Sequence, residues 1–296
     1  MAQVELLASD LHLMDKPSEE YRFGIFEQLQ ELAIEHKVKR ICLLGDLFDQ
    51  KDRHPGVLVN RVVNGLVSWT QYVDEVLILY GNHDSISSET PFLKFIEHIP
   101  KIRYINQPTV EQNRVYLPHS RQPLEDWKDI DMTGKLVFAH VTVSGSKAEN
   151  GFDLESSVQP DYFKNSLATF SGDVHVAQTI GPVNYIGSPY DTRFNSQSHG
   201  GSCLILHFGD DFDGGFGVLD TETLEFTRHP LWFPKKLMLD VTGPRDLELK
   251  LGKWYPPSGP PSQVKIRFHV DREHVGGWSE ARTEMIKWVE ACGHVL

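Results

Sequence analysis

Two spacings of apolar residues alternate along the first part of the chain. Apolar runs at residues 4–8, 41–44 and 76–80 have the composition of buried strands, and the second strand is expected from Lys39 to Leu44. Between these runs, residues 18–33 and 57–69 carry apolar side chains three and four positions apart, as on one face of a helix. Strands that alternate with helices predict a mainly parallel sheet with covering helices.

A short helix is expected from Thr90 or Pro91 through Ile99, and Ser18, followed by two glutamates, is expected to cap the first helix. After Ile99 the apolar runs are short and little helical sequence separates them. This pattern favours a second, more antiparallel sheet packed face to face on the first. Its strands are expected at residues 103–105, 110–117, 136–139, 167–170, 183–186, 203–208 and 216–219.

The pattern changes again after residue 234. A strand is expected at 237–241, a proline-rich loop at 254–261 and an alternating strand at 264–270. We therefore expect an α/β protein in which residues 1–234 form a two-sheet sandwich flanked by helices and residues 235–296 form a small α+β cap domain. The last helix of the cap is predicted from apolar residues on one face: Trp278, Ala281, Met285, Trp288, Val289 and Cys292.

Five short polar stretches each follow a predicted strand. Ligands of open α/β sheets gather at the carboxyl ends of strands, so these stretches can converge on one pocket. They are Ser9-Asp10-Leu11-His12, Gly45-Asp46-Leu47-Phe48-Asp49, Gly81-Asn82-His83-Asp84, Ala139-His140 and Gly172-Asp173-Val174-His175.

The side chains of these stretches are carboxylates, imidazoles and an amide without thiolate, a set that favours manganese, magnesium or iron and allows zinc. Asp10 and His12 stand two residues apart, so in an extended segment they point to the same side and can hold one ion. Asp46 has two carboxylate oxygens and can bridge to a second ion. Two such ions would clamp a phosphoryl centre and activate a water. The remaining candidate ligands are Asn82, His140, Asp173 and His175.

His83 lies between a candidate ligand and an acid, and it need not bind metal itself. It can donate a proton to a departing alkoxide or hydrogen-bond to the phosphate, and the carboxylate of Asp49 can orient its ring. Arg53 and His54 follow shortly after the second polar stretch and can contact a phosphodiester backbone. A solvated charged turn explains those two residues equally well.

Composition sets limits on partner and compartment. The net charge of -12 argues against a general coat for nucleic acid, so a DNA substrate requires a local basic patch or a partner. Three widely separated cysteines predict no disulfides and favour the reducing cytosol. Neither a leader-like segment nor an apolar stretch of membrane-spanning length is visible, so we expect a soluble, cytoplasmic protein.

The order of the five stretches resembles the calcineurin-like metallophosphoesterases, which share Asp-x-His, Gly-Asp-x-x-Asp, Gly-Asn-His-Asp, a single histidine after a strand, and a last Gly-x-x-His. The likeness runs from about residue 4 to about residue 195 in motif order. Two further segments, residues 140–147 (HVTVSGSK) and 185–189 (YIGSP), resemble the SbcD-type nuclease subunit. That subunit acts on DNA ends with an SbcC-type ATPase.

The resemblance implies a manganese-dependent DNA nuclease of the SbcD type, acting in DNA end processing, recombination or repair. Its partners would be DNA and an SbcC-type ATPase subunit. The chain could also form a homodimer. His83 would be the catalytic histidine and Asp49 its orienting partner. The first manganese ion would be held by Asp10, His12, Asp46 and His175, and the second by Asp46, Asn82, His140 and Asp173.

One position departs from the family pattern. Where the family has Gly-His-x-His, this chain has Gly172-Asp173-Val174-His175. An aspartate can bind manganese, so we expect a second site whose affinity or metal preference differs from that of the family.

Two rival functions stay open. A stand-alone phosphodiesterase or phosphatase acting on nucleotides or phosphoproteins would use the same metal ions. A non-catalytic scaffold of the same fold is the other rival, and Asp173 is the sequence feature that favours it. Intact Asp46 and His83 speak against the scaffold, while the cap and the Gly-Ser-Pro turn favour the nuclease.

Overall fold

The computed structural model describes residues 4–84, 90–194, 201–208, 224–251, 261–269 and 276–296. The chain forms two compact units, Met1–Pro189 with Gly201–Leu231 and Tyr190–Gly200 with Trp232–Leu296. The domain boundary expected between residues 234 and 235 stays a prediction. The expected strand at 216–219 and nearly all of the proline-rich loop at 254–261 lie outside the described residues.

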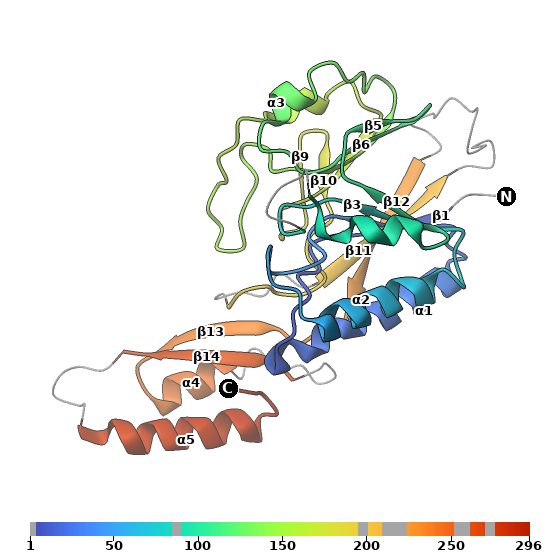
Figure 1. The fold of residues 1–296 in the computed structure, drawn as a ribbon. Helices are drawn as coiled ribbons and strands as arrows, with labels where there is room; N and C mark the ends of the chain where they lie inside the picture. The colour runs from blue at the N-terminus through green and yellow to red at the C-terminus, as the bar shows by residue number, and fades with distance from the viewer. Residues whose placement is uncertain (1–3, 85–89, 195–200, 209–223, 252–260, 270–275) are drawn as a thin grey trace. The chain divides into compact units, whose positions relative to one another are not determined.

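A largely parallel sheet of the first unit is built from the amino-terminal strands (Figure 1). β1 (Val4–Ala8), β2 (Arg40–Leu44), β3 (Glu75–Leu79) and β4 (Ile102–Ile105) run parallel. β11 (Gly201–Phe208) and β12 (Leu224–Leu231) add antiparallel pairs beside β1, in the order β12-β11-β1-β2-β3-β4. The mainly parallel sheet is confirmed. The placement of residues 103–105 and 203–208 in the second sheet is wrong, because a buried apolar run does not reveal its pairing partner.

The second sheet has the order β5-β6-β7-β8-β10-β9. Its central strands β6 (Arg114–Leu117), β7 (Leu136–His140), β8 (Ala168–Gly172) and β10 (Val183–Tyr185) pair parallel. The edge strands β5 (Thr109–Val110) and β9 (Gln178–Ile180) pair antiparallel. The expected antiparallel character of this sheet is therefore wrong. β6 and β7 are buried throughout, and burial of both faces is typical of parallel strands.

Helices flank the sandwich. The first predicted helix begins as a 3-10 turn, η1 (Pro17–Gly24), and continues as α1 (Ile25–Glu35), which packs against α2 (Gly56–Trp69). Ser18 lies inside η1 and is not its cap, because Pro17 already occupies the first turn with its fixed φ. The expected helix after Pro91 is a 3-10 helix, η2 (Phe92–His98). Among the described helices, none has the length and apolarity needed to cross a membrane.

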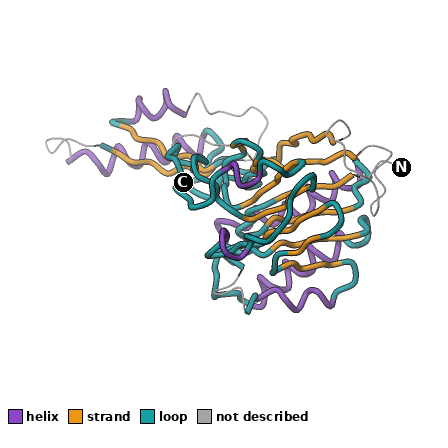
Figure 2. The backbone as a smooth tube through the Cα atoms, turned by 90° about the horizontal axis from the view of Figure 1, so that it is seen from above, coloured by secondary structure: helices purple, strands orange, loops and turns teal. Residues whose placement is uncertain are grey.

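Apolar layers cover both faces of the second sheet, and Figure 2 shows the strands as stacked orange layers with purple helices outside. The layer between the sheets includes Leu44, Leu79, Phe138 and Phe170. The opposite face of the second sheet is covered by residues around α3 (Pro123–Asp126) and η3 (Pro160–Phe163), including Trp127 and Phe163. Because β7 contributes side chains to both layers, packing on both of its faces positions its carboxyl end, where the fourth polar stretch, Ala139-His140, lies.

The second unit is a small α+β structure (Figure 1). β13 (Lys236–Val241) and β14 (Gln263–Phe268) pair parallel, and α4 (Pro244–Leu251) and α5 (Trp278–Ala291) pack together beside them. Apolar side chains from all four elements form its core, among them Val241, Leu247, Val264 and Met285. The expected strand at 237–241 and the last helix are confirmed, and the strand expected at 264–270 is found as far as Phe268, with residue 270 outside the described residues.

Candidate metal centre

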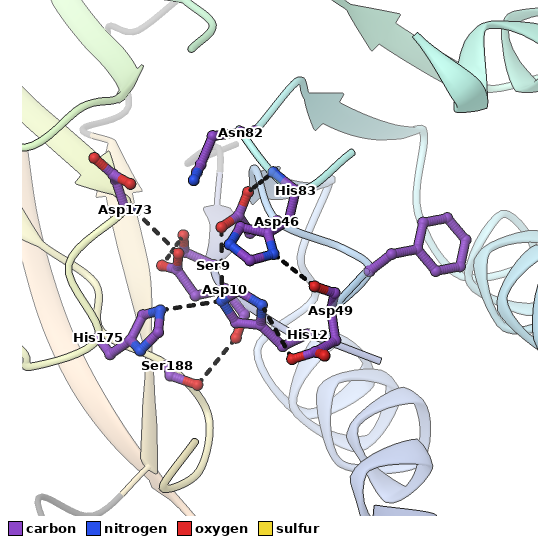
Figure 3. A network of polar contacts seen from close by, with 12 residues as sticks. Ser9, Asp10, His12, Asp46, Asp49, Asn82, His83, Asp173, His175 and Ser188 are labelled. Carbon is purple, nitrogen blue, oxygen red and sulfur yellow. Dashed lines mark hydrogen bonds and ion pairs between the residues drawn. The ribbon is translucent and has the colours of Figure 1, made fainter. Parts of the chain in front are cut away.

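The polar stretches after β1, β2, β3, β7 and β8 meet at one place in the first unit (Figure 3). Carboxylate oxygens and imidazole nitrogens from all five stretches form overlapping sets, so these side chains are neighbours although they are far apart in the chain. Within each set the ligand atoms lie within 4.8 Å of one another, and the sets are Asp10–His12–His175, His12–Asp46–His83 and Asp10–Asp46–His140.

The ligand loops have a strained backbone. Asp10 and His12 have φ angles of 56° and 42°, in the left-handed region that residues with a side chain rarely adopt. Their N–H groups donate to the carbonyls of Gly45 and Asp46 at 3.1 and 2.9 Å, so the loops after β1 and β2 are joined by backbone hydrogen bonds. Asp46 and Asp173, with φ angles of 55° and 78°, share this conformation. Such strain is concentrated at functional sites.

Glycines allow these loops to approach one another closely. Gly45 has a φ of +91°, and a Cβ at this position would lie 2.2 Å from Nδ1 of His140. A Cβ on Gly172 would lie 2.0 Å from the Ser9 hydroxyl and 2.3 Å from the carbonyl oxygen of Leu44. The glycine before the aspartate in each of these motifs is therefore required by contacts between loops, not only by the local turn.

Asp46 occupies the middle of the cluster. Its Oδ1 accepts the His83 N–H at 2.8 Å and lies 3.3 Å from Nε2 of His140, while Oδ2 lies 3.6 Å from Nε2 of His12. Each oxygen thus faces a different imidazole, as a bridging ligand requires. Burial opposes ionisation, but the imidazoles of His140 and His12 outweigh it and hold the pKa of Asp46 below its usual value.

His140 is fully buried and held in one tautomer. Its Nδ1–H donates to the carbonyl of Leu44 at 2.7 Å, so Nε2 faces the cluster. Burial lowers the pKa of His140, yet the Asp46 carboxylate raises it well above 6.5 in the metal-free protein. The Asn82 amide lies 2.9 Å from this Nε2. With its nitrogen turned inward, Asn82 donates to both Asp46 oxygens at 3.1 Å, and with its oxygen turned inward it could bind a metal ion.

His12 and His175 face each other at the other end of the cluster. Their Nε2 atoms are 3.0 Å apart, so they must share a proton or face a common cation. Burial lowers the pKa of His12 well below 6.5, so its imidazole is neutral and has a nitrogen lone pair that can bind a metal ion. Burial also raises the pKa of the adjacent Asp10 to about 6. Glu149 lies 3.7 Å from Nδ1 of His175 and orients that ring.

Asp173 lies at the margin of the cluster. Its Oδ2 accepts the Thr142 hydroxyl at 2.7 Å, and its Oδ1 lies 3.6 Å from Nε2 of His140. Its backbone N–H donates to Oδ1 of Asp10 at 3.1 Å. The side chain is 21% exposed, whereas that of His140 is fully buried. Asp173 therefore faces the second expected ion position from the solvent side.

His83 and Asp49 are in contact, but not in the way the sequence suggested. Nδ1 of His83 donates to the backbone carbonyl of Asp49 at 2.6 Å, while the Asp49 carboxylate lies 3.9 Å from Nδ1 of His12. The carbonyl fixes the tautomer of His83, with the proton on Nδ1 and the lone pair on Nε2. A neutral carbonyl, rather than the Asp49 carboxylate suggested by the sequence, therefore orients the His83 ring.

The expected substrate contacts of Arg53 and His54 stay predictions. The His54 ring packs between Phe48 and Phe92, with ring centroids 4.5 and 4.1 Å away, and both of its ring nitrogens are buried. These contacts favour a packing role for His54. Arg53 is exposed.

Several residues at the site were not selected from the sequence. Asp84 accepts backbone N–H groups from the second and third loops, and Ser188 donates to the carbonyl of Asp10 at 3.0 Å. The ring of His119 lies 6.1 Å from that of His140. Asp84 is the last residue of the third motif and could have been found there. Glu149 and His119 carry no local signal, because only the tertiary fold brings them to the ligands.

The donor set suits divalent cations. It combines carboxylates and imidazoles without thiolate, and most of these side chains are buried. Their nitrogen and oxygen atoms lie close enough together to bind the same ion, as the 3.0 Å between the Nε2 atoms of His12 and His175 and the 3.3 Å between His140 and Asp46 illustrate. Overlapping sets around Asp46 suit two ions side by side, which is the arrangement of dinuclear hydrolases. The two-sheet sandwich and this cluster together define a metal-dependent hydrolase.

Comparison with known families identifies the family of metal-dependent hydrolases to which the chain belongs. The calcineurin-like phosphoesterase profile matches residues 6–192, more than half of the chain, and the chain belongs to this family. Membership implies metal-dependent hydrolysis of phosphoesters and agrees with a dinuclear divalent site. A search of curated proteins gives no match.

Solved structures of related fold have low identity to this chain. The nuclease MPE of Pseudomonas putida is 13% identical over 68% of this chain and 83% of that one, with a TM-score of 0.38. The phosphoesterase Yfce of E. coli is 15% identical over 71% and 90%, with a TM-score of 0.36. A dimetal phosphatase of Danio rerio is 10% identical over 71% and 93%, with a TM-score of 0.44. These likenesses do not distinguish between activities.

Proposed function

We propose that this protein is a manganese-dependent DNA nuclease of the SbcD type, which hydrolyses phosphodiester bonds in DNA end processing, recombination or repair together with an SbcC-type ATPase subunit. The supporting observation is that the two segments resembling that subunit support the ligand loops. The Tyr185 hydroxyl accepts the Val143 N–H at 2.8 Å and donates to the Val141 carbonyl at 3.0 Å. The Ser188 hydroxyl donates to the backbone carbonyl of Asp10 at 3.0 Å, and the Ser188 N–H donates to the backbone carbonyl of His175, also at 3.0 Å.

The proposed ions use the ligands expected from the family pattern. Manganese suits this mixture of carboxylate, imidazole and amide, and magnesium, iron and zinc are the alternatives. When bound, such ions activate a water and neutralise charge on the phosphate. One ion would be held by Asp10, His12, Asp46 and His175, and the other by Asp46, Asn82, His140 and Asp173.

His83 is proposed as the proton donor to the leaving oxygen. Because its Nδ1–H is occupied by the Asp49 carbonyl, a protonated ring has only Nε2–H to give. Its backbone N–H is bonded to Asp46, so the ring is positioned relative to the ligands by the same loop that supplies Asn82. The chain carries a net charge of -12, so we propose that the ATPase partner supplies much of the grip on DNA.

The first test compares substrates with manganese present. Linear duplex DNA and bis-p-nitrophenyl phosphate are expected to be cleaved, and p-nitrophenyl phosphate is not. His83→Ala is expected to keep its bound metal by elemental analysis while turnover falls by about 10²–10⁴-fold. Turnover retained in His83→Ala would contradict its role as proton donor.

The other outcomes separate the rival functions. Hydrolysis of the monoester without DNA cleavage would favour a phosphatase. No hydrolysis of any of the three substrates, with metal bound and the fold intact, would favour a scaffold. An adjacent reading frame encoding a P-loop and a long coiled coil would support the ATPase partner, and co-purification of the two chains would test it directly.

A further inference from the structure

A polar cavity of about 400 Å³ opens next to the metal centre. It is lined by residues 106–108, which follow β4, and by residues 118–122, which follow β6, together with Asp126 and Trp127. Both segments leave their strands at carboxyl ends, as the ligand loops do. The cavity volume lies within the range of sites that bind small molecules.

His119 connects the cavity to the metal centre. It lines the cavity, and its ring lies 6.1 Å from the ring of His140 with an interplanar angle of 78°. Its backbone N–H donates to the carbonyl of Tyr80 at 2.9 Å, immediately before the third motif. His119 is therefore both a lining residue of the cavity and a neighbour of the expected ligand His140.

The lining is mostly polar: amides, one guanidinium, His119 and the carboxylate of Asp126 stand beside Pro108, Pro118 and Trp127. Asn106, Gln107 and Gln122 each offer both hydrogen-bond donors and acceptors, and Arg121 adds a guanidinium with several donors. Trp127, which is fully buried, has an indole Nε1–H with no hydrogen-bond partner in the described part of the chain. Amides match the edges of nucleobases, and a guanidinium matches either phosphate or guanine.

We propose that this cavity binds the nucleotide unit next to the scissile phosphate, with Arg121 on its phosphate or base and the amide side chains on the base edge. The inference rests on the proposed phosphodiesterase function and specifies what lies on one side of the cleaved bond. An apolar ligand does not suit this lining. A bare phosphate would leave the amide groups and most of the cavity unused.

The kinetic test uses two chromogenic diesters that differ in one substituent: bis-p-nitrophenyl phosphate and thymidine 5′-(p-nitrophenyl phosphate). For Arg121→Ala and Gln122→Ala, the ratio of kcat/KM for the nucleotide to that for the bis ester is expected to fall about tenfold, through KM. Lys128→Ala is the matched control, because this exposed cation beside α3 pairs with Glu125 at 2.6 Å and does not line the cavity. An unchanged ratio in both cavity variants overturns the proposal.

A binding measurement separates this inference from the proposed function. Calorimetry with metal-free protein in chelator compares thymidine 5′-monophosphate with inorganic phosphate. The nucleotide is expected to bind more tightly, and Arg121→Ala is expected to weaken it about tenfold. Equal affinity for both ligands, or a nucleotide affinity unaffected by Arg121→Ala, overturns the nucleotide subsite. If the protein hydrolyses no diester, the proposed function fails while this measurement still decides what the cavity binds.

Discussion

Asp173 is the side chain that we expect to change the second metal position without removing it. A carboxylate is shorter than the imidazole that the family places here, and part of its hydrogen-bonding capacity is taken by Thr142. Its nearer oxygen is still only 3.6 Å from Nε2 of His140. The side chain is therefore within reach of an ion held by His140 and Asp46, on the exposed side.

Removing Asp173 is expected to empty the second position. We expect Asp173→Ala to bind one divalent ion per chain instead of two, since it deletes a charged ligand from the more exposed side of the site. Elemental analysis after dialysis against manganese measures the ratio. Asp161→Ala, an exposed aspartate in η3, is the control. An unchanged ratio in Asp173→Ala would show that Asp173 is not a ligand.

Proton competition is expected to govern metal affinity at low pH. Burial raises the pKa of Asp10 to about 6, and the Asp46 carboxylate, against burial, raises that of His140 well above 6.5. Both groups gain protons as the pH falls, and both must lose them to bind metal. Manganese affinity measured by calorimetry is therefore expected to fall about tenfold or more between about pH 7.5 and about pH 5.5. An affinity independent of pH over this range would contradict it.

Among the structural elements, the loops after β2 and β3 are joined by one buried carboxylate. Asp84 Oδ1 accepts the N–H groups of Leu47 at 2.9 Å and Phe48 at 3.4 Å, and Oδ2 accepts those of Asp46 at 3.1 Å and Gly81 at 2.8 Å. Burial and the nearby Asp46 carboxylate raise the pKa of Asp84 to about 7. Asp84 thus positions the backbone of Asp46 and belongs to none of the three ligand sets.

Asp84→Asn is expected to weaken metal binding about 10–100-fold, because an amide has one acceptor oxygen and turns N–H groups toward backbone N–H donors. Faster hydrogen exchange at the amides of Asp46 and Leu47 is expected to accompany the loss. Asp129→Asn, at an exposed aspartate, is the matched control. Wild-type affinity and exchange in Asp84→Asn would refute this positioning role.

At the scale of the whole first unit, a buried ion pair links the two sheets. Glu5 on β1 is fully buried, and Arg114 on β6 is 4% exposed. The guanidinium contacts both oxygens of Glu5, at 2.6 and 2.8 Å. Arg40 on β2 adds a third contact at 3.2 Å. The pair is satisfied on both sides, which is the condition for keeping charges in a sandwich interior.

Breaking this pair from one side is expected to destabilise the protein strongly. Arg114→Met removes the bidentate partner of Glu5, and the unfolding free energy measured in urea is expected to fall by about 3–5 kcal/mol. The double variant Glu5→Leu with Arg114→Met removes both charges and is expected to recover much of that loss. If the double variant is as unstable as the sum of both single variants, the two residues do not act as a pair.

The sequence predictions were correct where neighbouring residues in the chain determine the structure, and they failed where residues far apart in the chain do so. Strands before the polar stretches were predicted correctly because a buried strand is a continuous apolar run, as in β1 and β3. β12 was missed because it is mostly exposed and contains polar residues and Pro230. The pairing of β11 with β1 joins residues about two hundred positions apart, and no local pattern encodes such a partner.

The sequence by itself determined the chemistry of the site: which carboxylates, imidazoles and amide follow the strands, and in what order. Only the tertiary structure decided how they act, because orientation depends on atoms from distant parts of the chain. In the folded protein His83 hydrogen-bonds to the carbonyl of Asp49, and Asp84 accepts hydrogen bonds from the backbone of two loops. It also placed His119 between His140 and a cavity. Side-chain type is a property of one position, whereas distances between ligands are set by the packing of both sheets.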